Sequence, residues 1–248
     1  MIIDVHTHIG RDRVFDVIIQ ETELLDACNQ NGIEIALVQP LVDSPDLETS
    51  RKAHDQVAAF ARANPGRIYG IASMSPHIDG YEAEITRCVK ELGFVGVKLS
   101  PDAHACSPTT ADGRRVFQIG RELGIPVMVH TGSGIPASAP ALLLPIAKEF
   151  ADVKIIMAHG GANILSGEAM IVAQECPNIS IDATWCGAHV IAGFIKKLGS
   201  GRVMFASDMP SNIPVELVKF RTIHLTPDEM EDCMWRTAAR VFNLPVRG

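Results

Sequence analysis

Aromatic residues are scarce in this sequence, and cysteine pairs, basic runs and long apolar runs are absent from it. Phe, Tyr and Trp together make up 5% of the 248 residues, so the core has to consist mainly of Ile, Val, Leu, Ala and Met. Apolar residues still reach 47% and charged residues 21%, which is ordinary for a globular protein with a large core.

Each of these absences excludes a class of protein. No apolar run approaches the roughly 18 residues that a membrane-spanning helix needs. A net charge of −7, without any run rich in Lys and Arg, argues against nucleic acid as a partner. The first predicted strand begins at Met1, which leaves no room for a cleavable leader. We therefore expect a cytoplasmic protein that binds neither membranes nor nucleic acid.

The six cysteines are scattered along the chain and show no Cys-X-X-Cys spacing. In a chain of this length, that pattern indicates reduced cysteines in a cytosolic protein and argues against a disulfide framework or a structural zinc site. The cysteines are Cys28, Cys88, Cys106, Cys176, Cys186 and Cys233.

Apolar runs with strand character alternate with helical patterns along the whole chain. Strands are predicted over residues 1–10, 33–40, 67–74, 94–101, 125–130, 153–159, 179–184 and 203–208. Helices are predicted over 21–31, 46–64, 81–92, 111–123, 137–150, 167–176, 188–198, 215–222 and 227–242. Eight strands that alternate with helices are typical of parallel β-α units closed into a barrel. We predict an α/β fold, a (β/α)8 TIM barrel that forms a single domain over residues 1–248.

His6 and His8 follow the first apolar run. Side chains two residues apart on a strand point to the same face, so the two imidazoles project together, about as far apart as one small cation can bridge. Neutral imidazole is the commonest nitrogen ligand of zinc and similar metals. The pair alone is a weak signal, because such histidines also occur as surface or packing pairs.

Further polar residues stand on later strands, and in this architecture the site lies at the carboxyl ends of the strands. His130, His159 and Asp208 end the fifth, sixth and eighth predicted strands, and Lys98 lies on the fourth. A single strand-end histidine can be a core residue bonded to a backbone carbonyl, whereas several that converge on one face indicate a site.

Nitrogen and oxygen ligands of this kind suit Zn²⁺, or alternatively Mn²⁺, Fe²⁺ or Co²⁺. The candidate ligands are His6, His8, His130 and Asp208. The other five histidines fall in predicted helices or loops, where a solvated or capping role is expected, and two of these, His104 and His189, could still reach the site from loops. They are His54, His77, His104, His189 and His224.

The residues that carry this pattern lie in five short blocks: Asp4-Val-His-Thr-His8, Gly96-Val-Lys-Leu99, Pro126-Val-Met-Val-His-Thr-Gly132, Met157-Ala-His-Gly-Gly161 and Phe205-Ala-Ser-Asp-Met-Pro210. In this order they resemble the signature blocks of the amidohydrolase superfamily, and above all its amidohydrolase-2 branch of metal-dependent TIM-barrel hydrolases. The tail from Trp235 to Leu244 resembles the closing helix of that branch. The resemblance covers nearly the whole chain, and it is specific for fold and metal centre but not for substrate.

The resemblance implies roles for the strand-end residues. His6 and His8 would be metal ligands, and His130 and Asp208 would complete a site for one ion. His159 would be an acid or base beside the ion. Asp208 would also accept the proton of the metal-bound water, whose pKa a divalent ion lowers towards neutrality.

Lys98 leaves two interpretations open. In the superfamily's binuclear members, a carboxylated lysine at this place bridges two ions, and His130 and His159 would then bind the second one. Otherwise Lys98 is an ammonium that binds an anionic substrate group or pairs with a carboxylate such as Asp102. We favour one ion over two, because amidohydrolase-2 members are mostly mononuclear.

The leading hypothesis for function is metal-dependent hydrolysis of a small amide, lactone or ester. The alternative is a non-hydrolytic, metal-dependent decarboxylase or hydratase that acts on a small unsaturated or aromatic carboxylic acid. A metal-bearing protein without turnover is disfavoured, since every expected catalytic position is filled. Trp185, which follows the seventh strand, either forms a wall of the pocket or packs under a loop. Relatives of this type often pair, so a homodimer is expected.

Overall fold

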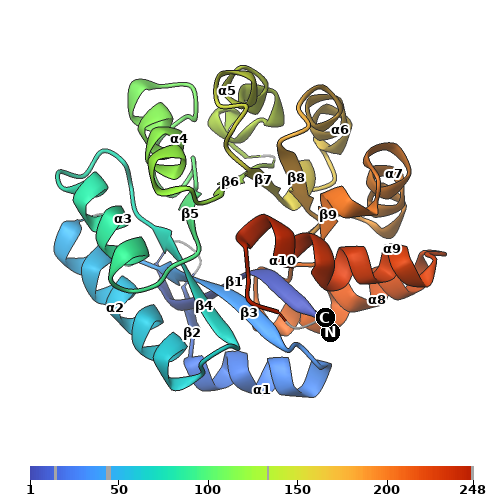
Figure 1. The fold of residues 1–248 in the computed structure, drawn as a ribbon, viewed down its shortest axis with the longest axis horizontal. Helices are drawn as coiled ribbons and strands as arrows, with labels where there is room; N and C mark the ends of the chain where they lie inside the picture. The colour runs from blue at the N-terminus through green and yellow to red at the C-terminus, as the bar shows by residue number, and fades with distance from the viewer. Residues whose placement is uncertain (14–15, 43–45, 133, 247–248) are drawn as a thin grey trace.

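The computed structural model describes residues 1–13, 16–42, 46–132 and 134–246. Its centre is a curled sheet of nine strands in the order β2-β1-β3-β4-β5-β6-β7-β8-β9 (Figure 1). The strands are β1 (Ile3–Asp12), β2 (Val17–Ile19), β3 (Ile35–Leu41), β4 (Ile68–Ser73), β5 (Gly96–Leu99), β6 (Val127–His130), β7 (Ile155–Ala158), β8 (Ile179–Asp182) and β9 (Val203–Met204).

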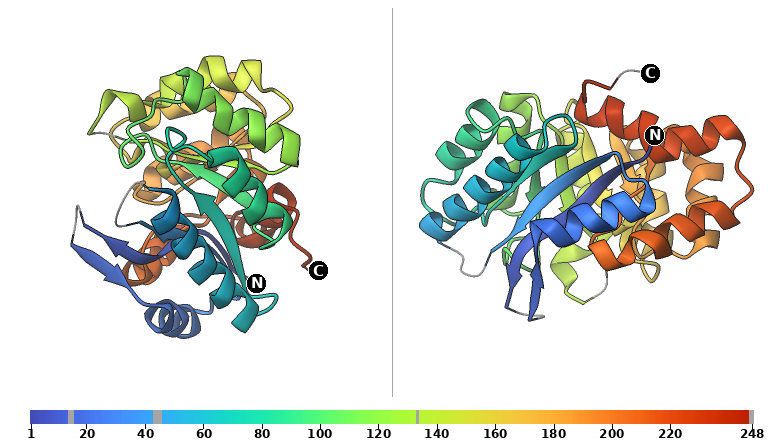
Figure 2. Two further views of the ribbon diagram at one scale, coloured as in Figure 1. Left: turned by 90° about the vertical axis from the view of Figure 1, so that its left-hand side faces the viewer. Right: turned by 90° about the horizontal axis from the view of Figure 1, so that it is seen from below.

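Neighbouring strands from β1 and β3 through to β9 pair in parallel, and β2 adds an antiparallel hairpin to the end of β1. The two edges of the curled sheet meet, because the Val5 N–H donates to the Phe205 carbonyl at 3.3 Å and the Asp208 N–H to the His6 carbonyl at 2.7 Å. The predicted (β/α)8 barrel is confirmed, and each of the eight predicted strands overlaps an observed one, although the strand predicted over 203–208 is only β9 (Val203–Met204) in the structure. The hairpin strand β2, which projects beyond the barrel (Figure 2), was not predicted.

Helices form the outer layer around this sheet (Figures 1 and 2). They are α1 (Glu21–Asn31), α2 (Leu47–Ala63), α3 (Tyr81–Lys90), α4 (Ala111–Leu123), α5 (Leu143–Glu149), α6 (Ser166–Glu175), α7 (Ala188–Leu198), α8 (Ile213–Thr222), α9 (Pro227–Glu231) and α10 (Thr237–Phe242). Side-chain caps fix several starts: Asp46 accepts from the Thr49 N–H and Thr110 from the Gly113 N–H.

Two predicted helices differ in detail from the structure. The helix expected over 137–150 begins only at Leu143, because Pro136 and Pro140 each start a short 3₁₀ turn before it. The helix expected over 227–242 is continuous but contains a π-helical stretch, Asp232–Arg236, between α9 and α10. Neither difference moves a strand end.

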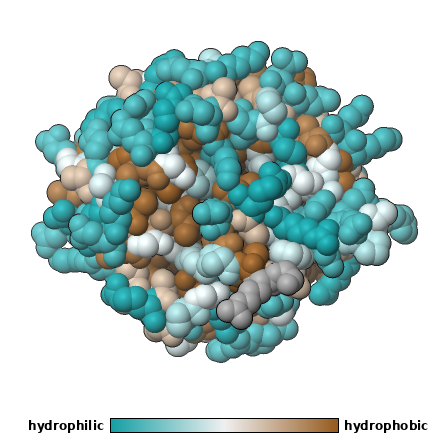
Figure 3. All heavy atoms as spheres, viewed as in Figure 1, coloured by the Kyte–Doolittle hydropathy of each residue, from teal (hydrophilic) through white to brown (hydrophobic). Residues whose placement is uncertain are grey.

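The apolar core has two layers. Most buried side chains lie between the sheet and the surrounding helices. A smaller cluster fills the inside of the barrel and is closed by α10, which crosses the middle of the ring in Figure 1. Its strand members include Ile3, Val5, Met128, Ile156 and Met204. Hydrophilic residues dominate the rim of the same view in Figure 3, with hydrophobic residues exposed between them. Among the described residues, every helix is too short or too polar to span a lipid bilayer.

An irregularity in β1 positions the histidines. The pairing of β1 with β3 shifts register between Asp4 and Thr7. Ile3 and Val5 belong to the barrel-interior cluster, so unbroken alternation would point His6 and His8 out of the barrel. A bulge places an extra residue on one strand and changes the direction of the side chains after it. The shift therefore turns both imidazoles inward, above the apolar interior.

Candidate active site

The side chains of His6 and His8, in the middle of β1, converge with that of Asp208, in the segment after β9. The Nε2 atoms of His6 and His8 lie 3.1 Å apart, and each lies 3.3 Å from Oδ1 of Asp208. These three residues form one group whose potential ligand atoms all lie within 4.8 Å of one another. The structure thus brings the His-X-His pair and the aspartate together, and their role as metal ligands stays a prediction.

This arrangement fits a divalent metal ion. Ligand atoms bound to one ion at about 2.1 Å lie about 3.0 to 3.4 Å from one another in tetrahedral or octahedral geometry. The three separations in the group, 3.1, 3.3 and 3.3 Å, match that spacing. Two imidazole nitrogens and a carboxylate oxygen are also a donor set that Zn²⁺ and Mn²⁺ both accept. The expected divalent metal is therefore supported by the geometry.

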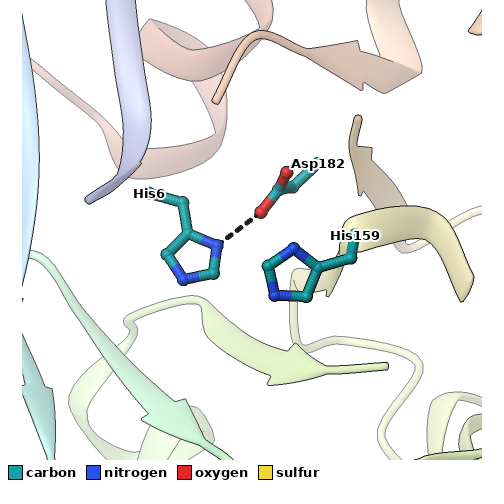
Figure 4. Close-up of side chains that lie close together, drawn as sticks. All are labelled: His6, His159 and Asp182. Carbon is teal, nitrogen blue, oxygen red and sulfur yellow. Dashed lines mark hydrogen bonds and ion pairs between the residues drawn. The ribbon is translucent and has the colours of Figure 1, made fainter. Parts of the chain in front are cut away.

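Asp182 is a further member of the site. It ends β8, is fully buried, and holds Nδ1 of His6 with Oδ2 at 2.6 Å (Figure 4). Its other oxygen, Oδ1, accepts hydrogen bonds from the backbone N–H and the hydroxyl of Thr184. Because the carboxylate accepts a hydrogen bond from Nδ1–H of His6, the other ring nitrogen, Nε2, carries the free lone pair and faces His8 and Asp208. Asp182, His6 and His159 form a second group of possible ligands.

Lys98 lies inside the same cluster. Its side chain is buried and its Nζ is 2.9 Å from Nε2 of His6. Burial lowers the pKa of Lys98 to about 8, although the carboxylates of Asp208 and Asp182 act in the opposite direction. The amine and a metal ion would use the same lone pair of His6. Lys98 therefore has to turn away from His6, towards a substrate or another partner, when an ion is bound.

His130 and His159 stand beside each other at the ends of β6 and β7. Their ring centroids are 4.8 Å apart, and the His159 ring is 4.9 Å from that of His6. Burial lowers the pKa of both imidazoles, which favours their neutral forms. His130 lies 3.9 Å from Asp102 and belongs to neither of the two ligand groups at this site. Its role as a fourth metal ligand stays a prediction.

Three strand ends at the site have an unusual backbone. His159, Trp185 and Asp208 follow β7, β8 and β9 with φ of 65°, 62° and 68°. This left-handed region is costly for residues other than glycine, and such residues cluster at functional sites when the surrounding structure fixes them. Here Asp4 supplies part of that support, since its carboxylate accepts from the backbone N–H and the hydroxyl of Ser207.

The Trp185 indole is 48% exposed and its Nε1–H donates to Oδ2 of Asp208 at 2.9 Å. The sequence left two interpretations of Trp185, a wall of the pocket or a side chain packed under a loop. Its exposure and its hydrogen bond to Asp208 place it beside the proposed metal ligands, which agrees with the first interpretation. Burial acts to raise the pKa of Asp208, but the hydrogen bond from His8 and the nearby imidazoles hold it well below its ordinary value.

The sequence reasoning missed Asp182 and the brace between Asp4 and Ser207. Asp182 ends an apolar strand in the same way as Asp208, so the rule that singled out Asp208 could have found it. His54 was expected to be solvated or to cap a helix, but it is fully buried. His104, which could have reached the site from its loop, instead accepts a hydrogen bond from the backbone N–H of Ser100.

The fold and the donor set define a metal-dependent barrel of a known family. The family model described as Amidohydrolase (Amidohydro_2) matches residues 3–244, and the chain belongs to this family. The sequence resemblance is thereby confirmed.

Individual proteins that are similar to this chain include several decarboxylases. The chain is 30% identical over 146 residues to the gamma-resorcylate decarboxylase of Polaromonas sp. (strain JS666), and this match covers 52% of the chain but only 43% of the relative. Among solved structures, it is similar to 2,6-dihydroxybenzoate decarboxylase from Rhizobium, with a TM-score of 0.79, 18% identity and 99% of each chain covered. It is also similar to dihydroxybenzoic acid decarboxylase from Polaromonas sp. JS666 with bound manganese and 2-nitroresorcinol, with a TM-score of 0.76, 16% identity, and 99% of this chain and 98% of that one covered.

The expectation of hydrolysis is wrong. The curated relative and these solved neighbours are decarboxylases, which are lyases, and they match the alternative of a metal-dependent decarboxylase. Zinc gains no support either, since the metal named in a neighbour is manganese. The sequence could not separate the two reactions, because metal-dependent hydrolases and decarboxylases of one fold share the same ligand pattern.

Proposed function

We propose that this chain is a metal-dependent decarboxylase of small aromatic carboxylic acids that carry a ring hydroxyl. The observation that carries the proposal is the sequence match to gamma-resorcylate decarboxylase. The convergence of His6, His8 and Asp208, which could hold a metal ion, supports it. A buried amine at Lys98 next to these residues suits a substrate that brings a negative charge into the site. The cytoplasmic location, the single domain over 1–248 and the homodimer stay predictions from the sequence.

His6, His8 and Asp208 would hold the ion, with His130 as the proposed fourth ligand, and Mn²⁺ is the ion that we favour. When bound, a divalent cation would neutralise and orient the oxygens of the acid. Asp182 keeps the His6 ring oriented through the 2.6 Å contact at Nδ1. Trp185 does the same for Asp208 through its indole N–H.

The reaction breaks the bond between the ring and the carboxylate carbon. The ring carbon takes up a proton, the C–C bond then breaks, its electron pair returns to the ring, and CO₂ leaves. We assign the proton delivery to His159, whose ring lies against those of His6 and His130 and whose Nδ1 is buried without a hydrogen-bond partner in the described structure. The negative charge of a bound acid would act against the burial that lowers the pKa of His159, so that its ring could carry this proton. Lys98 would bind the anionic substrate by charge.

The test is a comparison of two compounds with Mn²⁺-loaded protein. With 2,6-dihydroxybenzoate, we expect resorcinol and CO₂ in equal amounts, and we expect neither after the metal has been removed by a chelator. The methyl ester of the same acid is the matched control, because it can be hydrolysed but cannot lose CO₂ directly. Hydrolysis of the ester, with no CO₂ from 2,6-dihydroxybenzoate or from a panel of hydroxybenzoates, would contradict the proposal.

A further inference from the structure

Trp185 is exposed beside the proposed metal ligands. Nearly half of its surface, 48%, is accessible, whereas the polar residues at the neighbouring strand ends are buried or half-buried. Its Nε1–H lies 2.9 Å from Asp208, whose other oxygen lies 3.3 Å from both His6 and His8. A ring held at this group of ligands therefore comes within contact distance of the indole.

The backbone of Trp185 is held in place by a buried carboxylate on α8. Its backbone has a φ of 62°, and its N–H donates to Oε1 of Glu216 at 3.1 Å. Glu216 is fully buried on α8 and also accepts from Asn212 at 3.1 Å and from Lys219. Asn212 in turn donates to the carbonyl of Ser207, the residue before Asp208, at 3.0 Å. One buried carboxylate thus ties together the two turns that present Trp185 and Asp208.

A Trp side chain combines a large flat apolar surface with a polar N–H, and it is enriched at interfaces where one end contacts an apolar partner and the other a polar one. The indole N–H is already used by Asp208, so the part of Trp185 that remains for a ligand is its apolar surface. Aromatic acids offer a flat ring as the complement to such a surface, and aromatic pairs prefer offset or edge-to-face contact. The chain has few other aromatic residues, 5% in total, to provide this contact.

We propose that Trp185 is the residue that selects aromatic over non-aromatic acids, and that Glu216 is the positioning residue that holds it in place. This inference rests on the proposed decarboxylase function. Loss of the ring contact should weaken binding of an aromatic acid by roughly 2- to 12-fold, the range measured for aromatic pairs, in addition to any effect that loss of the hydrogen bond to Asp208 has on both aromatic and saturated acids.

The experiment uses the Mn²⁺-loaded chain and two probes: KM is measured for 2,6-dihydroxybenzoate, and the inhibition constant is measured for cyclohexanecarboxylate. Trp185→Leu removes the ring, whereas Trp185→Phe keeps a ring, and both remove the hydrogen bond to Asp208. We expect Trp185→Leu to weaken binding of the aromatic acid more than that of the saturated acid, and Trp185→Phe to retain most of the difference between the two probes. If both variants weaken both probes equally, the indole acts only through Asp208 and the inference is overturned.

Glu216 is tested by a conservative pair of variants. Glu216→Gln keeps an oxygen that can accept from the Trp185 N–H, and Glu216→Ala does not. We expect Glu216→Ala to raise KM for 2,6-dihydroxybenzoate by a larger factor than it lowers kcat, because Glu216 also holds the turn before Asp208 through Asn212, and we expect Glu216→Gln to restore both. A general structural role would instead lower Tm and kcat together in both variants, which would overturn the positioning role.

A fluorescence titration separates this inference from the proposed reaction. The Trp235→Phe background leaves Trp185 as the single tryptophan, since the chain has two. Saturable quenching by 2,6-dihydroxybenzoate, without CO₂ release from it, would support the ring contact and count against the reaction. CO₂ release with a KM that Trp185→Leu does not change would support the reaction and overturn the inference.

Discussion

The chain contains two buried clusters of histidine and carboxylate, and they differ in how completely their polar atoms are paired. The site cluster at the strand ends consists of His6, His8, Lys98, His159, Asp182 and Asp208. The outer cluster, between α2, α3 and β4, consists of Arg51, His54, Glu84 and Arg87. Both contain a group of side chains that is geometrically able to hold a metal, since Glu84 and His54 lie close to Cys88.

In the outer cluster each buried polar atom has a defined partner. His54 bonds to Glu84 at 2.9 Å through Nδ1 and accepts from the Ser73 N–H at 3.2 Å through Nε2. Arg51 and Arg87 complete the bonding of the Glu84 carboxylate at 2.8 to 2.9 Å. Because these bonds occupy the polar atoms of His54 and Glu84, we interpret this cluster as a structural clamp between two helices.

In the site cluster, one nitrogen atom has too many close polar neighbours, while two other nitrogen atoms have no hydrogen-bond partner in the described structure. Nε2 of His6 faces Lys98, His8 and Asp208 within 3.3 Å, more partners than one nitrogen can bond. At the same time, Nδ1 of His8 and Nδ1 of His159 are buried without a hydrogen-bond partner in the described structure. Unpaired buried polar atoms are costly, and the described atoms of the site cluster include two of them, whereas those of the outer cluster include none.

The largest expected effect is on stability, in the outer cluster. Glu84→Gln removes the charge that two arginines and His54 share, and we expect the free energy of unfolding to fall by about 3 kcal/mol, with Mn²⁺ affinity unchanged. Denaturant unfolding and calorimetry measure the two. Glu82→Gln is the matched control: its half-exposed pair with Arg115 should contribute less than about 1 kcal/mol. A loss of metal binding in Glu84→Gln would break the distinction between the clusters.

The converse holds for Asp208→Asn in the site cluster. Asn tolerates the left-handed backbone at this position, so the fold and Tm should stay near those of the parent chain. Mn²⁺ affinity should fall by more than about 100-fold, beyond the cost of losing an outer partner of a ligand. Manganese electron paramagnetic resonance reports the bound fraction. Unchanged Mn²⁺ affinity would exclude Asp208 as a ligand.

A smaller loss of metal affinity is expected for Asp182→Asn. The neutral amide orients His6 less firmly than the carboxylate does, and such outer partners typically account for about 10- to 100-fold in affinity. Thr184→Val, which removes only the hydroxyl donor to Asp182, should have a weaker effect in the same direction. If Thr184→Val weakened Mn²⁺ binding more than Asp182→Asn did, the proposed role of Asp182 would be wrong.

The smallest effect is the pH dependence of the outer cluster. Burial acts to raise the pKa of Glu84, but hydrogen bonds from His54, Arg87 and Arg51 outweigh it and hold the pKa below the ordinary value of 4.5. A carboxyl with a depressed folded-state pKa stabilises the protein above its unfolded-state pKa and loses this effect as pH falls. The stability difference between the parent chain and Glu84→Gln should thus be constant from about pH 8 to about 5.5 and shrink below about 4.5. A difference that grew on acidification would contradict this sign.

Sequence patterns predicted the strands, the barrel and the set of strand-end residues, because apolar periodicity and strand-end chemistry are local properties. His6, His8 and Asp208 could therefore be placed together from the order of residues alone. The inward turn of His6 and His8 could not, since it depends on a register shift of β1 against β3. A helix pattern likewise gave no sign that His54 is buried against Glu84.

The type of reaction could not be predicted from the sequence either. A divalent ion with histidine and aspartate ligands serves hydrolysis and decarboxylation alike, and the pocket that surrounds the ion separates them. The proposed wall of that pocket is Trp185, whose contact with Glu216 is a long-range one between the segment after β8 and α8. Neither residue type nor spacing indicates such a contact.

The closure of the barrel also sets an order of events during folding. The first strand bonds to the last, through Val5 and Phe205 and through Asp4 and Ser207, across about two hundred residues of chain. Contacts this distant in sequence form slowly and late. His6 and His8 are synthesised before Asp208, yet they meet it only when the ring has closed. Metal uptake at this site would therefore mark the completion of folding, and a partly folded chain would hold two of the three ligands but not the third.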